Sequence, residues 1–217
     1  MNLILIHGFA ASPAIWEFQK REFSGEHRIF TAPRAIETLE NAVVVGWSMG
    51  GWKAMELYRD FPHKVKALVL VSAFAKYLSS DDYPFGISPA LLDNLEKRMR
   101  ADYKSGLRYF YGLVSNNKEL DYLFDSLPVP DKKDIDRWFE KLRQQDMREL
   151  LPRIAAPVLL LHGADDRVTP VGASEYLHAK IPHSELRVFK AVGHAPMLDA
   201  PAEFNSLLRK FLKENAG

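Results

Sequence analysis

Short runs of apolar residues recur along the chain, and each is followed by turn residues and then by apolar positions at helical spacing. Such runs are typical of parallel strands that helices cover on both faces. We therefore predict strands over residues 3–6, 43–45, 67–71 and 158–161, a less regular one over 185–189 and an edge strand over 27–31. Strands that alternate with helices predict an α/β protein with a mostly parallel, doubly wound sheet.

The pattern changes after residue 73, where a long stretch has no strand pattern and several amphipathic helices instead. We predict that residues 74–156 form a helical cap, inserted into a core made of residues 1–73 and 157–217. Apolar side chains at intervals of three or four predict one long cap helix that packs over the active edge of the sheet. They are Leu92, Leu95, Met99, Tyr103, Leu107 and Phe110.

Composition narrows the chemistry that is available to this chain. The 217 residues are enough for one domain with a full core, and the formal charge of +1 gives no reason to expect nucleic acid or an anionic membrane as partner. The absence of cysteine excludes disulfides, thiolate metal sites and a cysteine nucleophile. No segment resembles a signal peptide or a membrane span, so we expect a soluble, cytoplasmic monomer.

A serine lies between two glycines at the end of the predicted strand 43–45. Gly46, Ser48 and Gly50 have the G-x-S-x-G spacing of a nucleophile elbow, a sharp strand-to-helix turn that leaves the serine hydroxyl projecting from the sheet. A helical pattern follows the motif directly, as an elbow requires. The structural alternative is a turn serine that only caps the helix.

A serine hydroxyl is a poor nucleophile, so Ser48 needs a base and a group that orients the base. His194 follows the last predicted strand in a loop, and Asp165 and Asp166 follow the strand 158–161. The order Ser, Asp, His is that of α/β-hydrolases, but either aspartate could be the acid, the other capping the next turn. We interpret the remaining histidines as structural, without metal-ligand spacing: His7, His27, His63, His162, His178 and His183.

Acyl transfer also requires two backbone N–H groups that stabilise the oxyanion. One usually comes from the residue after the nucleophile and the other from the loop after an early strand. In this chain those positions are Met49 and Phe9. Small residues around Phe9 would let that loop approach the elbow.

The segments His7-Gly8-Phe9 and Gly46–Gly51, with Asp166 and His194, resemble the α/β-hydrolase pattern over nearly the whole chain. In that family the acid lies four residues before a proline, which selects Asp166. Further segments resemble the BioH family of pimeloyl-acyl-carrier-protein methyl ester carboxylesterases: Trp47, residues 84–89, residues 146–148, residues 194–196 and residues 201–204. The chain looks like a compact version of the fold that lacks the leading strand pair.

This resemblance implies removal of the methyl group from a pimeloyl ester carried on acyl carrier protein, in biotin precursor synthesis, without a cofactor. Other readings share the same fold. They are a general short-chain carboxylesterase or thioesterase, a hydrolase of carbon–carbon bonds, and a non-catalytic ligand-binding protein. Pocket and cap, rather than fold, decide among the enzymes, whereas a broken triad, which is not visible here, would favour the binding protein.

An acidic carrier protein would favour a basic surface on the cap. On one continuous helix, Lys97, Arg100, Lys104 and Arg108 would share an arc of roughly 80°. The alternative is a solvated helix face. For the acyl pocket we predict five apolar or aromatic side chains, which could instead be core between cap and sheet: Trp47, Phe9, Phe85, Phe110 and Tyr111.

Overall fold

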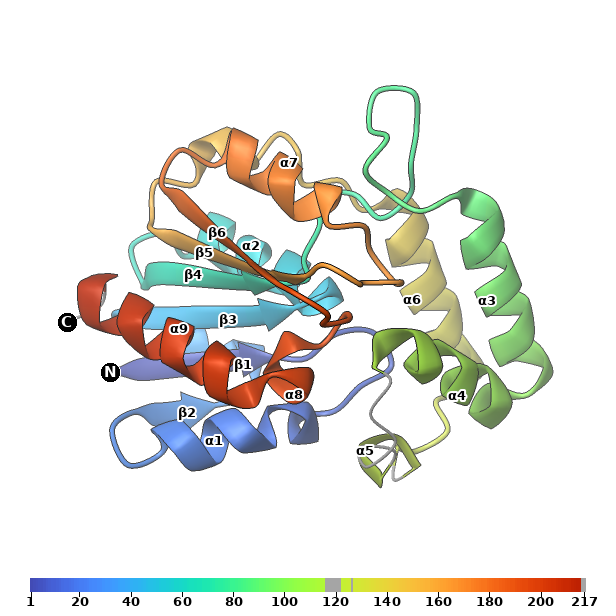
Figure 1. The fold of residues 1–217 in the computed structure, drawn as a ribbon, viewed down its shortest axis with the longest axis horizontal. Helices are drawn as coiled ribbons and strands as arrows, with labels where there is room; N and C mark the ends of the chain where they lie inside the picture. Colours follow the sequence, from blue (N-terminus) through green and yellow to red (C-terminus); the bar gives the residue numbers. More distant parts are fainter. Residues whose placement is uncertain (116–121, 126, 216–217) are drawn as a thin grey trace.

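Six parallel strands form one sheet in the computed structural model, which describes residues 1–115, 122–125 and 127–215 (Figure 1). Their order across the sheet is β2-β1-β3-β4-β5-β6, so the chain reverses its direction across the sheet once, between β2 and β3, as a doubly wound fold requires. Every predicted strand is confirmed, and six strands agree with a compact version of the fold. The strands are β1 (Asn2–Ile6), β2 (Arg28–Phe30), β3 (Ala42–Trp47), β4 (Val65–Val71), β5 (Val158–Gly163) and β6 (Ser184–Phe189).

Helices cover both faces of the sheet. In Figure 1, α1 and α9 lie side by side in front of the strands, and α2 lies behind them. In the described ranges, no helix combines the length and apolar character needed to cross a membrane. The helices are α1 (Glu17–Phe23), α2 (Met49–Asp60), α3 (Pro89–Ala101), α4 (Tyr103–Val114), α5 (Tyr122–Asp125), α6 (Lys132–Gln144), α7 (Gly172–Lys180), α8 (Pro196–Asp199) and α9 (Pro201–Asn215), with short 3-10 helices at Pro13–Trp16, Pro33–Thr38 and Leu151–Arg153.

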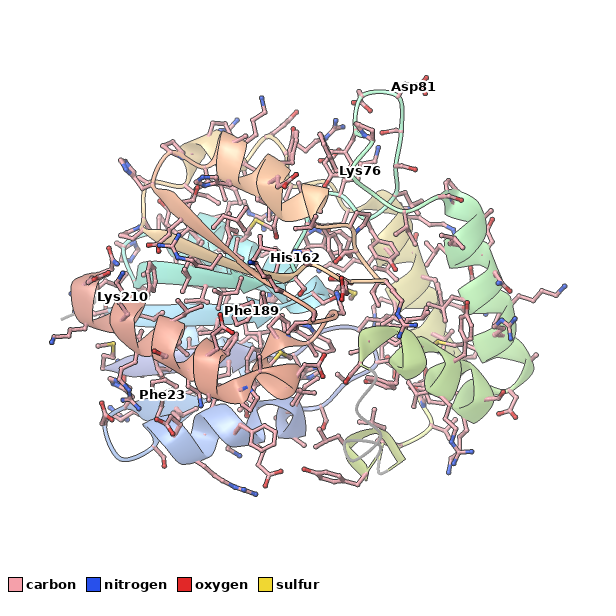
Figure 2. The ribbon with its side chains drawn as sticks, in the orientation of Figure 1. Phe23, Lys76, Asp81, His162, Phe189 and Lys210 are labelled. Carbon is pink, nitrogen blue, oxygen red and sulfur yellow. The ribbon has the colours of Figure 1, made fainter. Side chains whose placement is uncertain are left out.

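The core lies on both sides of the central strands. All six residues of β3 are buried, since it pairs with β1 and β4 and is covered on both faces. Phe23 of α1 and Phe189 at the end of β6, both labelled in Figure 2, are also buried. Uninterrupted runs such as Val43–Val45 therefore predicted strands correctly, because both faces need apolar side chains.

Helices α3, α4 and α6 lie beyond the carboxyl ends of the strands (Figure 1). Ion pairs join α6 to α3 and to the core. Arg143 contacts Asp93 at 2.7 Å, and Lys141 contacts Glu56 of α2 at 2.8 Å. The helices thus occupy the place where a cap would cover the active edge, while the domain boundaries at residues 74 and 156 stay a prediction.

The prediction of one long cap helix is wrong. The chain breaks at Asp102, whose extended backbone (φ −152°, ψ 106°) ends α3 and whose carboxylate accepts a hydrogen bond from the Ser105 N–H that starts α4. The two helices then pack closely at a glycine: a Cβ on Gly106 would lie 2.7 Å from the backbone nitrogen of Met99. The apolar residues are therefore divided between two helices that pack against each other, and the 80° arc of basic residues does not exist.

Candidate active site

Ser48 occupies the turn between β3 and α2. Its backbone has φ 55° and ψ −124°, a strained conformation for a residue with a side chain. Gly46 and Gly50 leave no room for a Cβ, which would lie 2.4 Å from the carbonyl oxygen of Gly50 and 2.5 Å from that of Ile6, respectively. The turn has the geometry of a nucleophile elbow.

Gly46→Ala is expected to lower the free energy of unfolding by about 3 kcal/mol, because the added methyl group would overlap backbone atoms that cannot move aside. Urea unfolding followed by circular dichroism measures the effect. Gly112→Ala is the matched control: a Cβ on this α4 residue meets nothing within 4 Å, and alanine favours a helix. If Gly46→Ala unfolded at the same midpoint urea concentration as the wild type, the close approach of Gly46 to the backbone of Gly50 would be contradicted.

The carboxylate of Asp166 is completely buried and has five donors around it. Oδ1 accepts hydrogen bonds from the backbone N–H groups of Val168 (2.8 Å) and Thr169 (2.9 Å). Oδ2 lies 2.7 Å from Nδ1 of His194, 3.0 Å from Nε2 of His162 and 3.0 Å from the Thr169 hydroxyl. Of the two adjacent aspartates, Asp166 is thus the one that contacts His194.

Burial by itself would raise the pKa of Asp166, because it disfavours the charged form. The contacts with His194 and His162 outweigh burial and hold the pKa well below its ordinary value. Asp166 is therefore a carboxylate at neutral pH. It can orient the His194 ring and stabilise a positive charge on it.

His194 lies in the loop after β6, fully buried beside the elbow. The side chain of Trp47 donates a hydrogen bond to the His194 carbonyl oxygen (2.8 Å), and the two rings are 5.4 Å apart. Nε2 of His194 is buried and makes no hydrogen bond within the described residues, Ser48 included. The contact between hydroxyl and imidazole is commonly loose before substrate binds, so this nitrogen remains available to the serine proton.

The loop that carries Phe9 lies against the elbow. A Cβ on Gly8 would be 3.0 Å from the Cβ of Ser48, and the Cβ of Gly50 would meet the carbonyl oxygen of His7 at 2.6 Å. Met49 opens α2 directly after Ser48. The predicted oxyanion residues Phe9 and Met49 thus belong to two segments that adjoin Ser48.

Aromatic side chains from the cap surround Phe9. Its ring packs edge-on against Phe110 of α4 (5.3 Å) and against Trp138 and Phe139 of α6 (5.5 Å each). The hydroxyl of Tyr111 donates a hydrogen bond to the Ala10 carbonyl oxygen. Phe9, Phe110 and Tyr111, three of the predicted pocket residues, therefore lie together, and Trp47 lies beside His194.

Phe85 lies in a different aromatic cluster. Its ring packs against Tyr83 (5.6 Å) and against Tyr176 of α7 (5.4 Å). No ring contact joins it to the aromatic group around Phe9 in the described part of the chain. The structure does not bring Phe85 together with the other predicted pocket residues.

The four predicted docking residues are exposed but are divided between two helices. Lys97 and Arg100 belong to α3, and Lys104 and Arg108 to α4. Arg100 forms ion pairs with Glu96 and with Asp136 of α6, the latter at 2.7 Å. Its charge is therefore largely neutralised within the cap.

The last turn of α4 contacts three loops of the site. The carbonyl oxygen of Val114 accepts a hydrogen bond from the backbone N–H of His194 (3.0 Å), and the Ser115 hydroxyl binds Asp199 just beyond that loop. Arg167, next to Asp166, donates to the carbonyl oxygen of Gly112. With the bond from Tyr111 to the loop of Phe9, this turn joins the cap to the loops that carry His194, Asp166 and Phe9.

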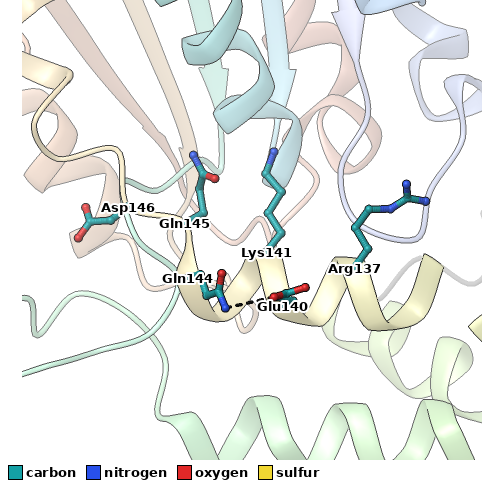
Figure 3. A pocket seen from close by; sticks show the side chains of 6 residues that line it. All are labelled: Arg137, Glu140, Lys141, Gln144, Gln145 and Asp146. Carbon is teal, nitrogen blue, oxygen red and sulfur yellow. Dashed lines mark hydrogen bonds between the residues drawn. The ribbon is translucent and has the colours of Figure 1, made fainter. Parts of the chain in front are cut away.

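Two surface hollows flank this arrangement. One, of about 500 Å³, runs along α6 and is lined by Arg137, Glu140, Lys141, Gln144, Gln145 and Asp146 (Figure 3). Its side chains are polar and include no predicted site residue. The other, of about 220 Å³, lies behind the His194 loop and is lined in part by Asp165, Arg167, Gly193 and Asp199.

Sequence reasoning missed three groups of the site. His162 and Thr169 bind Asp166, and Trp138 and Phe139 pack on Phe9. A signal existed for the first two, because residues at the end of β5 and in the loop after it must lie close to Asp166. The aromatic pair on α6 could be identified only as buried helix residues.

Comparison with known proteins places this geometry in a family. Residues 34–201 match the alpha/beta hydrolase fold. A pimeloyl-acyl-carrier-protein methyl ester esterase of Neisseria meningitidis (serogroup C) is 30% identical over 98% of this chain and 93% of its own length. One of that name from Nitrosomonas europaea is 28% identical over 94% of this chain and 93% of its own length.

Solved structures show the same fold. An esterase from Exiguobacterium antarcticum has a TM-score of 0.89 and 24% identity over 98% of this chain and 92% of its own. A bromoperoxidase from Bacillus anthracis has a TM-score of 0.87 and 22% identity over 98% and 91%. The relatives support an esterase function. The chain therefore belongs to the alpha/beta hydrolase fold family, and within it is related to the pimeloyl-acyl-carrier-protein methyl ester esterases.

Proposed function

We propose that this chain is a serine carboxylesterase that works through an acyl-enzyme. One observation carries the proposal: the buried Asp166–His194 pair, joined at 2.7 Å, lies beside an elbow that presents Ser48 in a strained turn. A serine that served only to cap a helix would need neither the positive φ nor a buried imidazole nearby. The arrangement supports nucleophilic catalysis.

In the proposed reaction, the Ser48 hydroxyl oxygen attacks the ester carbonyl carbon while Nε2 of His194 accepts the hydroxyl proton. The carbon–alkoxy bond then breaks, and the same proton passes to the departing alcohol. Water repeats the sequence on the acyl-enzyme, which releases the acid and restores Ser48. Asp166 keeps the proton of the resting imidazole on Nδ1 and remains ionised throughout, because its pKa is lowered by its contacts with the two histidines.

The backbone N–H groups of Phe9 and Met49 are the proposed oxyanion donors. Each would stabilise the negative oxygen of the tetrahedral intermediate, by about 3 kcal/mol in a typical case. The contact of Phe9 with three cap aromatics holds its loop against the elbow. Cap packing thereby supports the geometry of the oxyanion site.

For the substrate, we propose a methyl ester of a pimeloyl group on acyl carrier protein. Support comes from relatives of that name, which match nearly the whole chain. The cap, residues 74–156, would cover the acyl chain, with Trp47, Phe9, Phe110 and Tyr111 as apolar contacts. Phe85 is not among these proposed contacts, because it packs on Tyr176 of α7.

Methanol release from the carrier-bound pimeloyl methyl ester, measured beside release from methyl butyrate, tests this substrate. We expect a kcat/KM at least about a hundredfold higher for the carrier-bound ester, since only it can use the whole cap surface. Hydrolysis of methyl butyrate alone would favour a general short-chain esterase. A serine-directed phosphonate separates enzyme from binding protein, because it labels only an activated serine.

The carrier docking site needs revision because α3 and α4 are separate helices. Arg100 is tied to Glu96 and Asp136, so its replacement would disturb the cap itself. Lys97 and Lys104 are exposed near the break between the two helices. They remain proposed contacts for an acidic carrier, together with Arg108.

Lys97→Glu combined with Lys104→Glu is expected to raise KM for the carrier-bound ester about tenfold and to leave methyl butyrate hydrolysis unchanged. The reason is that charge reversal repels an acidic partner without touching the chemistry. Steady-state kinetics at low salt measures the effect. Lys210→Glu with Lys213→Glu on α9 is the matched control, at the opposite end of the molecule from the cap (Figure 2). If the two double variants raised KM for the carrier-bound ester equally, docking of the carrier on the cap would be contradicted.

A further inference from the structure

His162 is a buried titratable group that the proposed mechanism does not use. It lies at the end of β5, and Figure 2 shows it inside the molecule, among the strand ends. Its side chain has no exposed surface. This buried imidazole contacts Asp166, the partner of the proposed base His194. Its effect on Asp166 depends on which of its two ring nitrogens carries a proton.

The contacts of His162 indicate its tautomer. Nε2 lies 3.1 Å from the backbone carbonyl oxygen of Thr169 and 3.0 Å from Oδ2 of Asp166. Both oxygens can only accept, so Nε2 must carry a proton. Nδ1 lies 2.7 Å from the Ser174 hydroxyl of α7, which can donate to it. All contacts are thus satisfied by a neutral ring with its proton on Nε2.

A neutral His162 also agrees with the charges that Asp166 and His194 carry during the proposed reaction. When His194 accepts the serine proton, it becomes a cation beside Asp166. A second imidazolium on the same buried carboxylate would leave one charge uncompensated, which is costly in the interior. The charge of Asp166 also acts on Tyr77, whose pKa is raised by burial and by that carboxylate, so it stays neutral. Asp165 and Arg167 adjoin Asp166 in the chain and are exposed.

We propose that His162 is a positioning residue that, as a neutral Nε2–H donor, fixes the Asp166 carboxylate toward His194 and limits how strongly that carboxylate stabilises the protonated His194 ring. The inference rests on the proposed serine mechanism. Donation from His162 disperses part of the negative charge on Oδ2. Without it, the carboxylate would stabilise the His194 imidazolium more strongly.

His162→Phe is expected to move the acidic limb of the kcat/KM profile for methyl butyrate upward by about 0.5 to 1 pH unit, since that limb reports protonation of the free enzyme's base. His162→Gln is the matched variant, because its amide nitrogen can occupy the place of Nε2 and donate; its midpoint should stay within about 0.2 units of wild type. Equal losses of activity in both variants, with unshifted midpoints, would reduce His162 to a packing residue and overturn the proposal.

A second measurement tests the protonation of His162 directly. It requires neither that His162→Phe folds nor that the protein is active. Nitrogen-15 NMR of the wild-type imidazoles, with His162 assigned by its loss in His162→Gln, should show Nε2 protonated and Nδ1 unprotonated from pH 5 to 9. Titration of His162 within that range, or a proton on Nδ1 alone, would overturn the proposal. Failure of the serine mechanism would look different, because Ser48→Ala would then remain active whatever the state of His162.

Discussion

Ser48→Ala is expected to lower kcat by about a millionfold, the loss typical of removing the nucleophile from a serine triad. The substitution removes the one oxygen that can form the acyl-enzyme. Alanine has a Cβ like serine, so the strain of the backbone at φ 55° is the same in both proteins and the fold should persist. Activity on the carrier-bound ester and the thermal midpoint, measured on the same preparation, separate loss of chemistry from loss of structure.

The chain provides a matched serine for this experiment. Ser72, at the end of β4, is also fully buried, also has a positive φ (46°), and its hydroxyl has no hydrogen-bond partner among the described residues. Ser72→Ala should keep kcat within about twofold of wild type, since no reacting group depends on that hydroxyl. If Ser48→Ala kept more than about one per cent of turnover, the acyl-enzyme mechanism would be excluded.

Asp166→Asn should lower kcat by about ten-thousandfold, although it changes only one atom. The backbone N–H groups that bind Oδ1 are fixed, so the new amide nitrogen must take the place of Oδ2. There it donates to Nδ1 of His194 and forces the imidazole proton onto Nε2. A ring in that tautomer cannot accept the proton of Ser48.

Asp165→Asn is the control, because Asp165 is exposed and its neighbour is the one that binds His194. It should change kcat less than about twofold. The pH dependence of stability gives a second readout. Because folding lowers the pKa of Asp166, its charge stabilises the fold above the unfolded value of about 3.9, and that contribution is lost as pH falls through the folded value. The stability difference between wild type and Asp166→Asn should therefore shrink below about pH 4.

Strands and turns whose structure depends on residues close together in the sequence could be predicted. Val43–Val45 signalled a strand because both faces of β3 are buried, and the turn at Ser48 needs the two glycines that mark it. His194 and Asp166 follow strands, so their loops had to meet at one edge of the sheet. The contact between His194 and Asp166 could therefore be predicted from the fold and from the order of the residues along the chain.

Features that depend on contacts distant in sequence could not be predicted. The apolar stripe from Leu92 to Phe110 continues across Asp102, so its period hides the break, and only the packing of Gly106 on Met99 reveals it. The ion pair from Arg100 to Asp136 joins helices far apart in the chain. The role of His162 was missed for a related reason: a histidine at a strand end looks structural until its distance to Asp166 is known.

The hydrogen bond from the His194 N–H to the Val114 carbonyl oxygen has a consequence for turnover. A swing of α4 away from the sheet as a rigid lid would break this bond and release the loop that carries the base. An enzyme opened in that way would admit an ester without being able to cleave it. In the proposed enzyme, enclosure of the acyl chain by α4 and alignment of His194 would therefore have to occur together.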